Sequence, residues 1–161
     1  MNLHEHRDHP STDRSTKGVF YPGDVFTDAQ SPNKAATILL VEDEECVRTV
    51  TKEVLESEGY TVLEAADAND GIEVCERHHE RIDLLLSDVV MPGMNGRDMA
   101  RKIIEIKPDL RVIFMSGYTD NPVLREAFSD STTVYLQKPF TVDTLRTRIR
   151  QVLEGRIPSG D

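Results

Sequence analysis

The sequence contains no tryptophan, only two cysteines and no long apolar segment. Cys46 and Cys75 are not spaced as a CxxC pair, so we expect two partly buried thiols in a reducing compartment rather than a redox or metal site. No apolar run approaches the roughly 18 residues that span a bilayer, and no charged and then apolar leader opens the chain. These absences predict a cytoplasmic protein without membrane insertion.

Positive charge is also scarce. The chain of 161 residues has 19 lysines and arginines against 29 aspartates and glutamates, which gives a formal net charge of -10. Nucleic acids and anionic membranes repel such a surface, so the composition argues against direct nucleic-acid binding. The length accommodates one domain of ordinary size and some additional chain.

The chain divides into three parts by composition. Residues 1–36 are rich in polar residues and proline and show no sustained periodicity, which predicts a flexible N-terminal extension. Residues 37–154 alternate short apolar runs with amphipathic segments and form the predicted domain. Residues 155–161 are expected to be a flexible C-terminal tail.

Five short apolar runs and five amphipathic segments alternate along this domain. Several of the runs are apolar on both faces, which is typical of parallel strands covered by helices on both sides. The pattern predicts an α/β fold, a (βα)₅ unit with a doubly wound, five-stranded parallel sheet in a single domain. The predicted strands are 38–41, 61–63, 82–86, 112–115 and 134–136, and the predicted helices are 46–57, 69–78, 97–106, 122–128 and 142–153.

Polar and charged residues close four of the strands. Ligands of open α/β sheets bind beyond the carboxyl ends of the strands, so these residues are expected to share one cleft. No glycine-rich loop is present to cradle a preformed phosphate. The residues concerned are Glu42, Asp43, Asp88, Ser116 and Lys138.

Clustered carboxylates repel one another, and a bound hard cation relieves that repulsion. We therefore expect Mg²⁺, or Mn²⁺ in its place, with Asp43 and Asp88 as direct ligands. Glu42 is expected to act through water, and the main-chain carbonyl of Val90 to complete the protein's share of the ligands.

The remaining two residues suit a transferring phosphoryl group. Lys138 provides a compact positive charge for a carboxylate or phosphoryl oxygen, and Ser116 can donate a hydrogen bond to a second oxygen. Together with the cation, they would stabilise phosphoryl transfer by position and charge.

These residues lie in motifs that resemble the response-regulator receiver domain of two-component signalling, a CheY-like superfamily with a flavodoxin-like fold. The resemblance extends over residues 37–154. The matching segments are 38–44 (ILLVEDE), 86–96 (LSDVVMPGMNG), 115–117 (MSG) and 138–140 (KPF).

The resemblance implies a role for each residue. Asp88 would be the phosphoacceptor, Glu42 and Asp43 the acidic pair, and Lys138 the family's lysine. Ser116 would be the switch hydroxyl, and Tyr135, three residues before Lys138, lies where such domains often carry a rotating aromatic. The family also implies a cis peptide bond before Pro139.

For the whole chain, the resemblance implies a signalling domain and not an enzyme in the usual sense, because it catalyses only its own phosphorylation and dephosphorylation. The phosphoryl donor would be a histidine kinase or a histidine phosphotransfer protein, and the output would be contact with a downstream protein target. A homodimer through the face made by helix 4, strand 5 and helix 5 is also compatible with it. No output domain is expected in residues 155–161, and a single-domain regulator, a phosphorelay intermediate and the receiver of a hybrid kinase all stay open.

Two other functions fit the sequence less well. A phosphohydrolase with an aspartyl-phosphate intermediate resembles a family that needs a second aspartate two positions after the nucleophile, and here that position is Val90, which cannot transfer a proton. A scaffold that never accepts phosphate would not need the complete set of acidic, hydroxyl and lysine residues.

Overall fold

The computed structural model describes residues 36–117 and 133–156, and the following elements lie in these ranges. The strands are β1 (Thr37–Val41), β2 (Thr61–Ala65), β3 (Ile82–Asp88), β4 (Arg111–Ser116) and β5 (Thr133–Gln137). The helices are α1 (Glu45–Ser57), α2 (Ala68–His78), α3 (Gly96–Ile106) and α5 (Val142–Leu153).

The five strands form one parallel sheet in the order β2-β1-β3-β4-β5. The chain moves outward from β1 to β2 and then returns past β1 to β3, so the direction of winding reverses between β1 and β3. A crevice at the carboxyl ends of two such strands is where doubly wound sheets bind their ligands. The sheet order therefore directs attention to the residues that follow β1 and β3.

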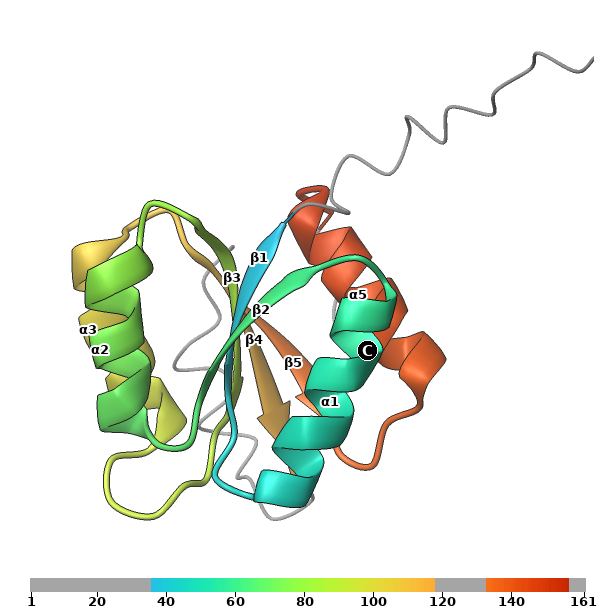
Figure 1. The fold of residues 1–161 in the computed structure, drawn as a ribbon, viewed down its shortest axis with the longest axis horizontal. Coiled ribbons are helices and arrows are strands. Elements are labelled where there is room, and N and C mark those ends of the chain that lie inside the picture. Colours follow the sequence, from blue (N-terminus) through green and yellow to red (C-terminus); the bar gives the residue numbers. More distant parts are fainter. Residues whose placement is uncertain (1–35, 118–132, 157–161) are drawn as a thin grey trace, which may run out of the picture. The chain divides into compact units, whose positions relative to one another are not determined.

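Two helices cover each face of the sheet: α2 and α3 lie on one side, and α1 and α5 on the other (Figure 1). The strands supply both layers because successive side chains point to opposite faces. In β1, Leu39 packs with the cluster under α2 and α3, while Leu40 packs with the cluster under α1 and α5. The continuous apolar runs in the sequence are explained by this burial on both faces.

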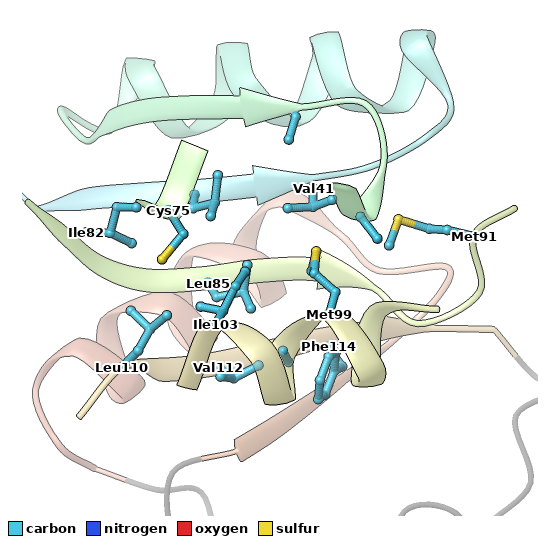
Figure 2. Close-up of a cluster of buried hydrophobic side chains, with 14 of the residues drawn as sticks. Val41, Cys75, Ile82, Leu85, Met91, Met99, Ile103, Leu110, Val112 and Phe114 are labelled. Atoms are coloured by element: carbon cyan, nitrogen blue, oxygen red, sulfur yellow. The ribbon is translucent and has the colours of Figure 1, made fainter. Parts of the chain in front are cut away.

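Figure 2 shows the cluster on the side of α2 and α3. Cys75 of α2 and Met99 of α3 are fully buried there, and Phe114 of β4 is only 2% exposed. Gly71 lets α2 approach closely, because a β-carbon at this position would lie 2.9 Å from the sulfur of Met99 and 3.1 Å from Val41. This layer fixes α3 against the sheet, which matters because α3 follows the loop after Asp88.

Helix α1 does not bury all of its apolar residues. Thr51 and Leu55 are buried against the sheet, whereas Val50 is 60% exposed. Cys46 is also exposed, so the expectation of two partly buried thiols is wrong for Cys46. Helical periodicity identifies an amphipathic segment, but packing of the whole layer decides which part of that segment faces the sheet.

This difference between the thiols predicts selective alkylation. Iodoacetamide should modify Cys46 in the folded protein and leave Cys75 unmodified until the chain unfolds, because Cys75 is inaccessible and burial raises the pKa of its thiol. The rate difference should be about three orders of magnitude or more if unfolding is the route to Cys75. Peptide mapping after timed alkylation measures it, with Cys46→Ser as the control. Fast modification of Cys75 in that variant would contradict the packing of α2.

The predicted architecture is confirmed as a flavodoxin-like, doubly wound parallel sheet in a single domain. The predicted helix 122–128 lies outside the described residues, as do the extension up to residue 35 and the tail from residue 157. In the described part of the chain, no helix is both long enough and apolar enough to cross a bilayer.

Candidate functional site

The acidic residues of the site follow directly from the ends of β1 and β3. Glu42 and Asp43 come just after Val41, the last residue of β1, and Asp88 is the last residue of β3. Val41 pairs with Ser87 in the sheet, so the following residues of the two strands emerge at the same level. The register therefore brings together carboxylates that are about 45 positions apart in the sequence.

The structure places these three carboxylates in one cluster. Glu42, Asp43 and Asp88 each offer an oxygen, and these oxygens lie within 4.8 Å of one another. Glu42 is fully buried and Asp88 is 8% exposed, while Asp43 is partly exposed. The cluster is thus closed toward the sheet and accessible to solvent on the side of Asp43.

Lys138 connects two of the carboxylates. Its ammonium donates to Asp88 Oδ2 at 3.0 Å and to Glu42 Oε2 at 3.1 Å. Burial lowers the pKa of Lys138, but the hydrogen bonds and charges of Asp88 and Glu42 outweigh this effect, so its pKa is raised overall and the side chain stays protonated. The peptide bond between Lys138 and Pro139 is cis, which confirms the expectation.

The carboxylate of Glu42 is held from both sides. Its Oε1 accepts a hydrogen bond from the backbone N–H of Glu44 at 3.1 Å, and its Oε2 accepts from Lys138. Burial raises the pKa of Glu42, although the N–H of Glu44 and the ammonium of Lys138 oppose that rise. Glu42 is therefore a fixed part of the site, and its predicted contact to a metal through water stays a prediction.

The backbone around Asp88 is fixed by three neighbours. The N–H of Val89 donates to the carbonyl of Met115 in β4 at 3.1 Å, and the hydroxyl of Ser87 donates to the carbonyl of Asp88 at 2.9 Å. The N–H of Gly96 donates to the carbonyl of Val89 at 2.9 Å, and a β-carbon on Gly96 would overlap the carbonyl oxygen of Asp88. Glycine is required there because the start of α3 lies directly against the end of β3.

The other predicted residues occupy different surroundings. Ser116 ends β4 and is 1% exposed, and its carbonyl accepts from the N–H of Lys138 at 2.7 Å. Val90 lies in the loop after β3 and is 64% exposed, and the ligand role predicted for its main-chain carbonyl stays a prediction. The ring of Tyr135 contacts Phe114 in β4, on the side of α2 and α3, with 5.6 Å between the ring centroids.

Two arginines that the sequence analysis did not single out contact this framework. The guanidinium of Arg48 donates to the main-chain carbonyl of Glu42 at 2.7 Å, and this hydrogen bond connects α1 to the loop that carries Glu42 and Asp43. Arg97, 7% exposed, lies near the ring of Tyr135. Both occupy the first turn of a helix, where the dipole disfavours positive charge. That unfavourable placement was a signal in the sequence that each arginine has a specific contact.

The donor set fits a hard divalent cation. The three carboxylates supply only oxygen, and among the described residues the one ammonium that is paired with them, that of Lys138, does not balance their negative charge. Mg²⁺ prefers oxygen ligands, retains several waters and needs few carboxylates from the protein. Receiver domains in general bind Mg²⁺ at an acidic pocket of this kind.

Comparison with known proteins identifies one family over most of the chain. The family model of the response regulator receiver domain matches residues 38–150. The response regulator receiver protein CpdR of Brucella abortus is 34% identical over 72% of this chain and 95% of its own length. The sensor kinase CckA of the same species is 40% identical over 74% of this chain, which corresponds to only 13% of that longer kinase.

A solved structure gives the same result. The crystal structure of the receiver domain from the hybrid histidine kinase CckA has a TM-score of 0.64 and 37% sequence identity, and the match covers 73% of this chain and 99% of that one. The chain therefore belongs to the family of response regulator receiver domains, which accept a phosphoryl group in two-component signalling.

Proposed function

We propose that Asp88 is the residue that accepts the phosphoryl group, in a reaction that requires Mg²⁺ or Mn²⁺. The observation that carries the proposal is the position of its carboxylate, which lies beside Glu42 and Asp43 and accepts a hydrogen bond from Lys138 at 3.0 Å. A carboxylate in this position has the nucleophilic oxygen, the neighbouring positive charge and the cation-binding oxygens that phosphoryl transfer needs.

In the proposed reaction, a carboxylate oxygen of Asp88 attacks the phosphorus of a phosphohistidine on the donor protein. The P–O bond forms as the P–N bond breaks, and the imidazole leaves with the electron pair. Lys138 holds a phosphoryl oxygen by charge, and Ser116 donates a hydrogen bond to another. Asp43, Asp88 and the carbonyl of Val90 would hold the divalent cation, which would supply positive charge beside the phosphoryl oxygens.

The role of Asp43 predicts a loss of metal affinity. Asp43→Asn should weaken Mg²⁺ binding by about tenfold or more, because it removes an anionic ligand from a site with few protein ligands. Isothermal titration calorimetry with Mg²⁺ measures the change. Glu44→Gln is the matched control, because Glu44 is exposed and its side chain is not part of the cluster. Unchanged Mg²⁺ affinity in Asp43→Asn would remove Asp43 from the ligand set.

The signalling role follows from the family. Receiver homologues work with histidine kinases or phosphotransfer proteins, and we propose that such a protein is the donor for Asp88 in the cytoplasm. The output would pass through Ser116 and Tyr135 to a protein target, and the domain would also catalyse its own dephosphorylation. We also propose a homodimer through the face made by helix 4, strand 5 and helix 5. Of this face, the structure describes β5 and α5, whereas residues 118–132 lie outside the described part of the chain.

A further inference from the structure

Arg97 occupies a position that is unfavourable for a cation. It is the second residue of α3, where the helix dipole opposes positive charge, and it is only 7% exposed. Removing a guanidinium from water is costly unless other groups in the protein stabilise it. The contacts of Arg97 should therefore explain why the sequence places an arginine there.

One such contact is with Tyr135 of β5. The central carbon of the guanidinium lies over the phenol ring, 6.0 Å from its centroid, which is at the outer limit of the cation–π range of about 6 Å. The same ring contacts Phe114, its register partner in β4, at an interplanar angle of 35°. Tyr135 is thus held on the side of α3 by a cation from one element and an aromatic ring from another.

Arg97 is itself fixed relative to Asp88. It follows Gly96 directly, and the N–H of Gly96 donates to the carbonyl of Val89. The α-carbon of Gly96 lies so close to the carbonyl of Asp88 that no side chain fits between them. Asn95 caps α3 by accepting from the N–H groups of Arg97 and Asp98, at 3.0 and 2.9 Å. The guanidinium is therefore carried by a helix start that is joined to the end of β3.

We propose that Arg97 is the positioning residue for Tyr135 and holds its ring on the α3 side of the sheet in the protein that carries no phosphoryl group. The family resemblance assigns control of this aromatic to Ser116, at the end of β4. The contacts in this chain add a second control point, in the first turn of α3. The orientation of Tyr135 is then preset by Arg97, and a shift at Asp88 reaches it through Gly96 and Arg97 as well as through Ser116.

The proposal is tested by NMR of the full chain without phosphoryl donor or metal, with ¹³C-labelled tyrosine rings and methionine methyl groups. The chain has four tyrosines, and Tyr135→Phe assigns the signal of interest. In Arg97→Met, the Tyr135 signals should move. The ratio of molecules with the ring on the α3 side to molecules with the ring turned away from it should fall by about 2- to 30-fold, as expected for loss of a cation–π contact. Ser116→Ala should move those signals less than Arg97→Met does.

The methyl signal of Met99 separates positioning from general disruption. Met99 is fully buried in α3, two residues after Arg97, so its signal should stay in place in Arg97→Met if only the ring is released. Arg97→Lys keeps the positive charge but lacks the planar guanidinium. Compared with Arg97→Met, it should therefore have a larger fraction of molecules with the Tyr135 ring on the α3 side. The proposal is overturned if Tyr135 keeps its signals in Arg97→Met, if Met99 moves as much as Tyr135, or if Ser116→Ala has the larger effect on the ring.

A second measurement, on the signal of Arg97 itself, covers the case in which Arg97→Met does not fold. In the wild-type chain, the guanidinium Hε signal of Arg97 should show an upfield ring-current shift, and Tyr135→Leu should abolish that shift. An Arg97 signal that is unaffected by Tyr135→Leu would also overturn the proposal. Because no phosphoryl group is present in either experiment, their failure would leave the assignment of Asp88 untouched.

Discussion

Asp88→Asn is expected to abolish phosphorylation by acetyl phosphate in the presence of Mg²⁺, whereas the wild-type chain gains one phosphoryl group. The substitution keeps the size of the side chain and replaces the nucleophilic carboxylate by an amide, which attacks phosphorus poorly. Keeping the shape matters because Asp88 is only 8% exposed at the end of β3. The expected effect is therefore complete loss of the reaction with the fold retained.

Intact-protein mass spectrometry after incubation with acetyl phosphate measures the outcome. Asp109→Asn is the matched control, because Asp109 is exposed and lies before β4, at the opposite end of the strands. It should be phosphorylated like the wild type, and chelation of Mg²⁺ should stop the reaction in both. Equal phosphorylation of Asp88→Asn and wild type would show that another residue accepts the group.

Lys138→Met is expected to lower the free energy of unfolding by about 3 kcal/mol at neutral pH, the lower end of the range for breaking a buried ion pair. Lys138 donates to Asp88 and Glu42, and Glu42 is fully buried. Without the ammonium, the repulsion between the carboxylates of Glu42 and Asp88 is no longer compensated by the charge of Lys138, and the folded state is destabilised. Added Mg²⁺ should restore part of the loss, because it binds the folded protein and replaces the missing positive charge.

The same variant should acquire a characteristic pH dependence. Burial raises the pKa of Glu42 in the folded protein above its usual 4.5, and Lys138 opposes that rise. In Lys138→Met, the folded state should bind a proton at Glu42 more tightly than the unfolded state does. Stability should therefore fall as the pH rises from the unfolded pKa through the folded pKa of this group.

Urea unfolding followed by circular dichroism, with and without Mg²⁺ and at several pH values, checks both expectations. Lys52→Met is the matched control, because Lys52 forms an exposed ion pair with Glu64 at 3.0 Å, and exposed pairs contribute little to stability. A Lys138→Met variant as stable as the control, with no response to Mg²⁺, would show that the lysine does not balance the carboxylates.

Local patterns in the sequence were enough to locate the strands and the residues that close them. Alternation and apolar runs predicted residues 82–86 as a strand, and β3 covers Ile82–Asp88. The strand ends then identified Glu42, Asp43 and Asp88 as a group, and the structure places their oxygens within 4.8 Å of one another. This worked because parallel strands place their carboxyl ends at one edge, whatever the distance along the chain.

The contacts of individual side chains required the tertiary structure. The apolar spacing of α1 did not reveal that Val50 and Cys46 are exposed and that Thr51 faces the sheet. Helix periodicity gives the relative angle between side chains, while the packing of α1 against the sheet sets the absolute rotation of the helix. Local sequence contains only the first of these two quantities.

The sequence by itself determined the class of fold, the edge at which the chemistry lies and the residue types that carry it, because these depend on periodicities of two and 3.6 residues and on strand ends. The strand order, the two hydrogen bonds of the Lys138 ammonium and the contact between Arg97 and Tyr135 were decided only by the tertiary structure. Arg97 and Tyr135 are 38 positions apart and belong to α3 and β5. No local pattern relates two such side chains, since their distance depends on how the helix packs across the sheet.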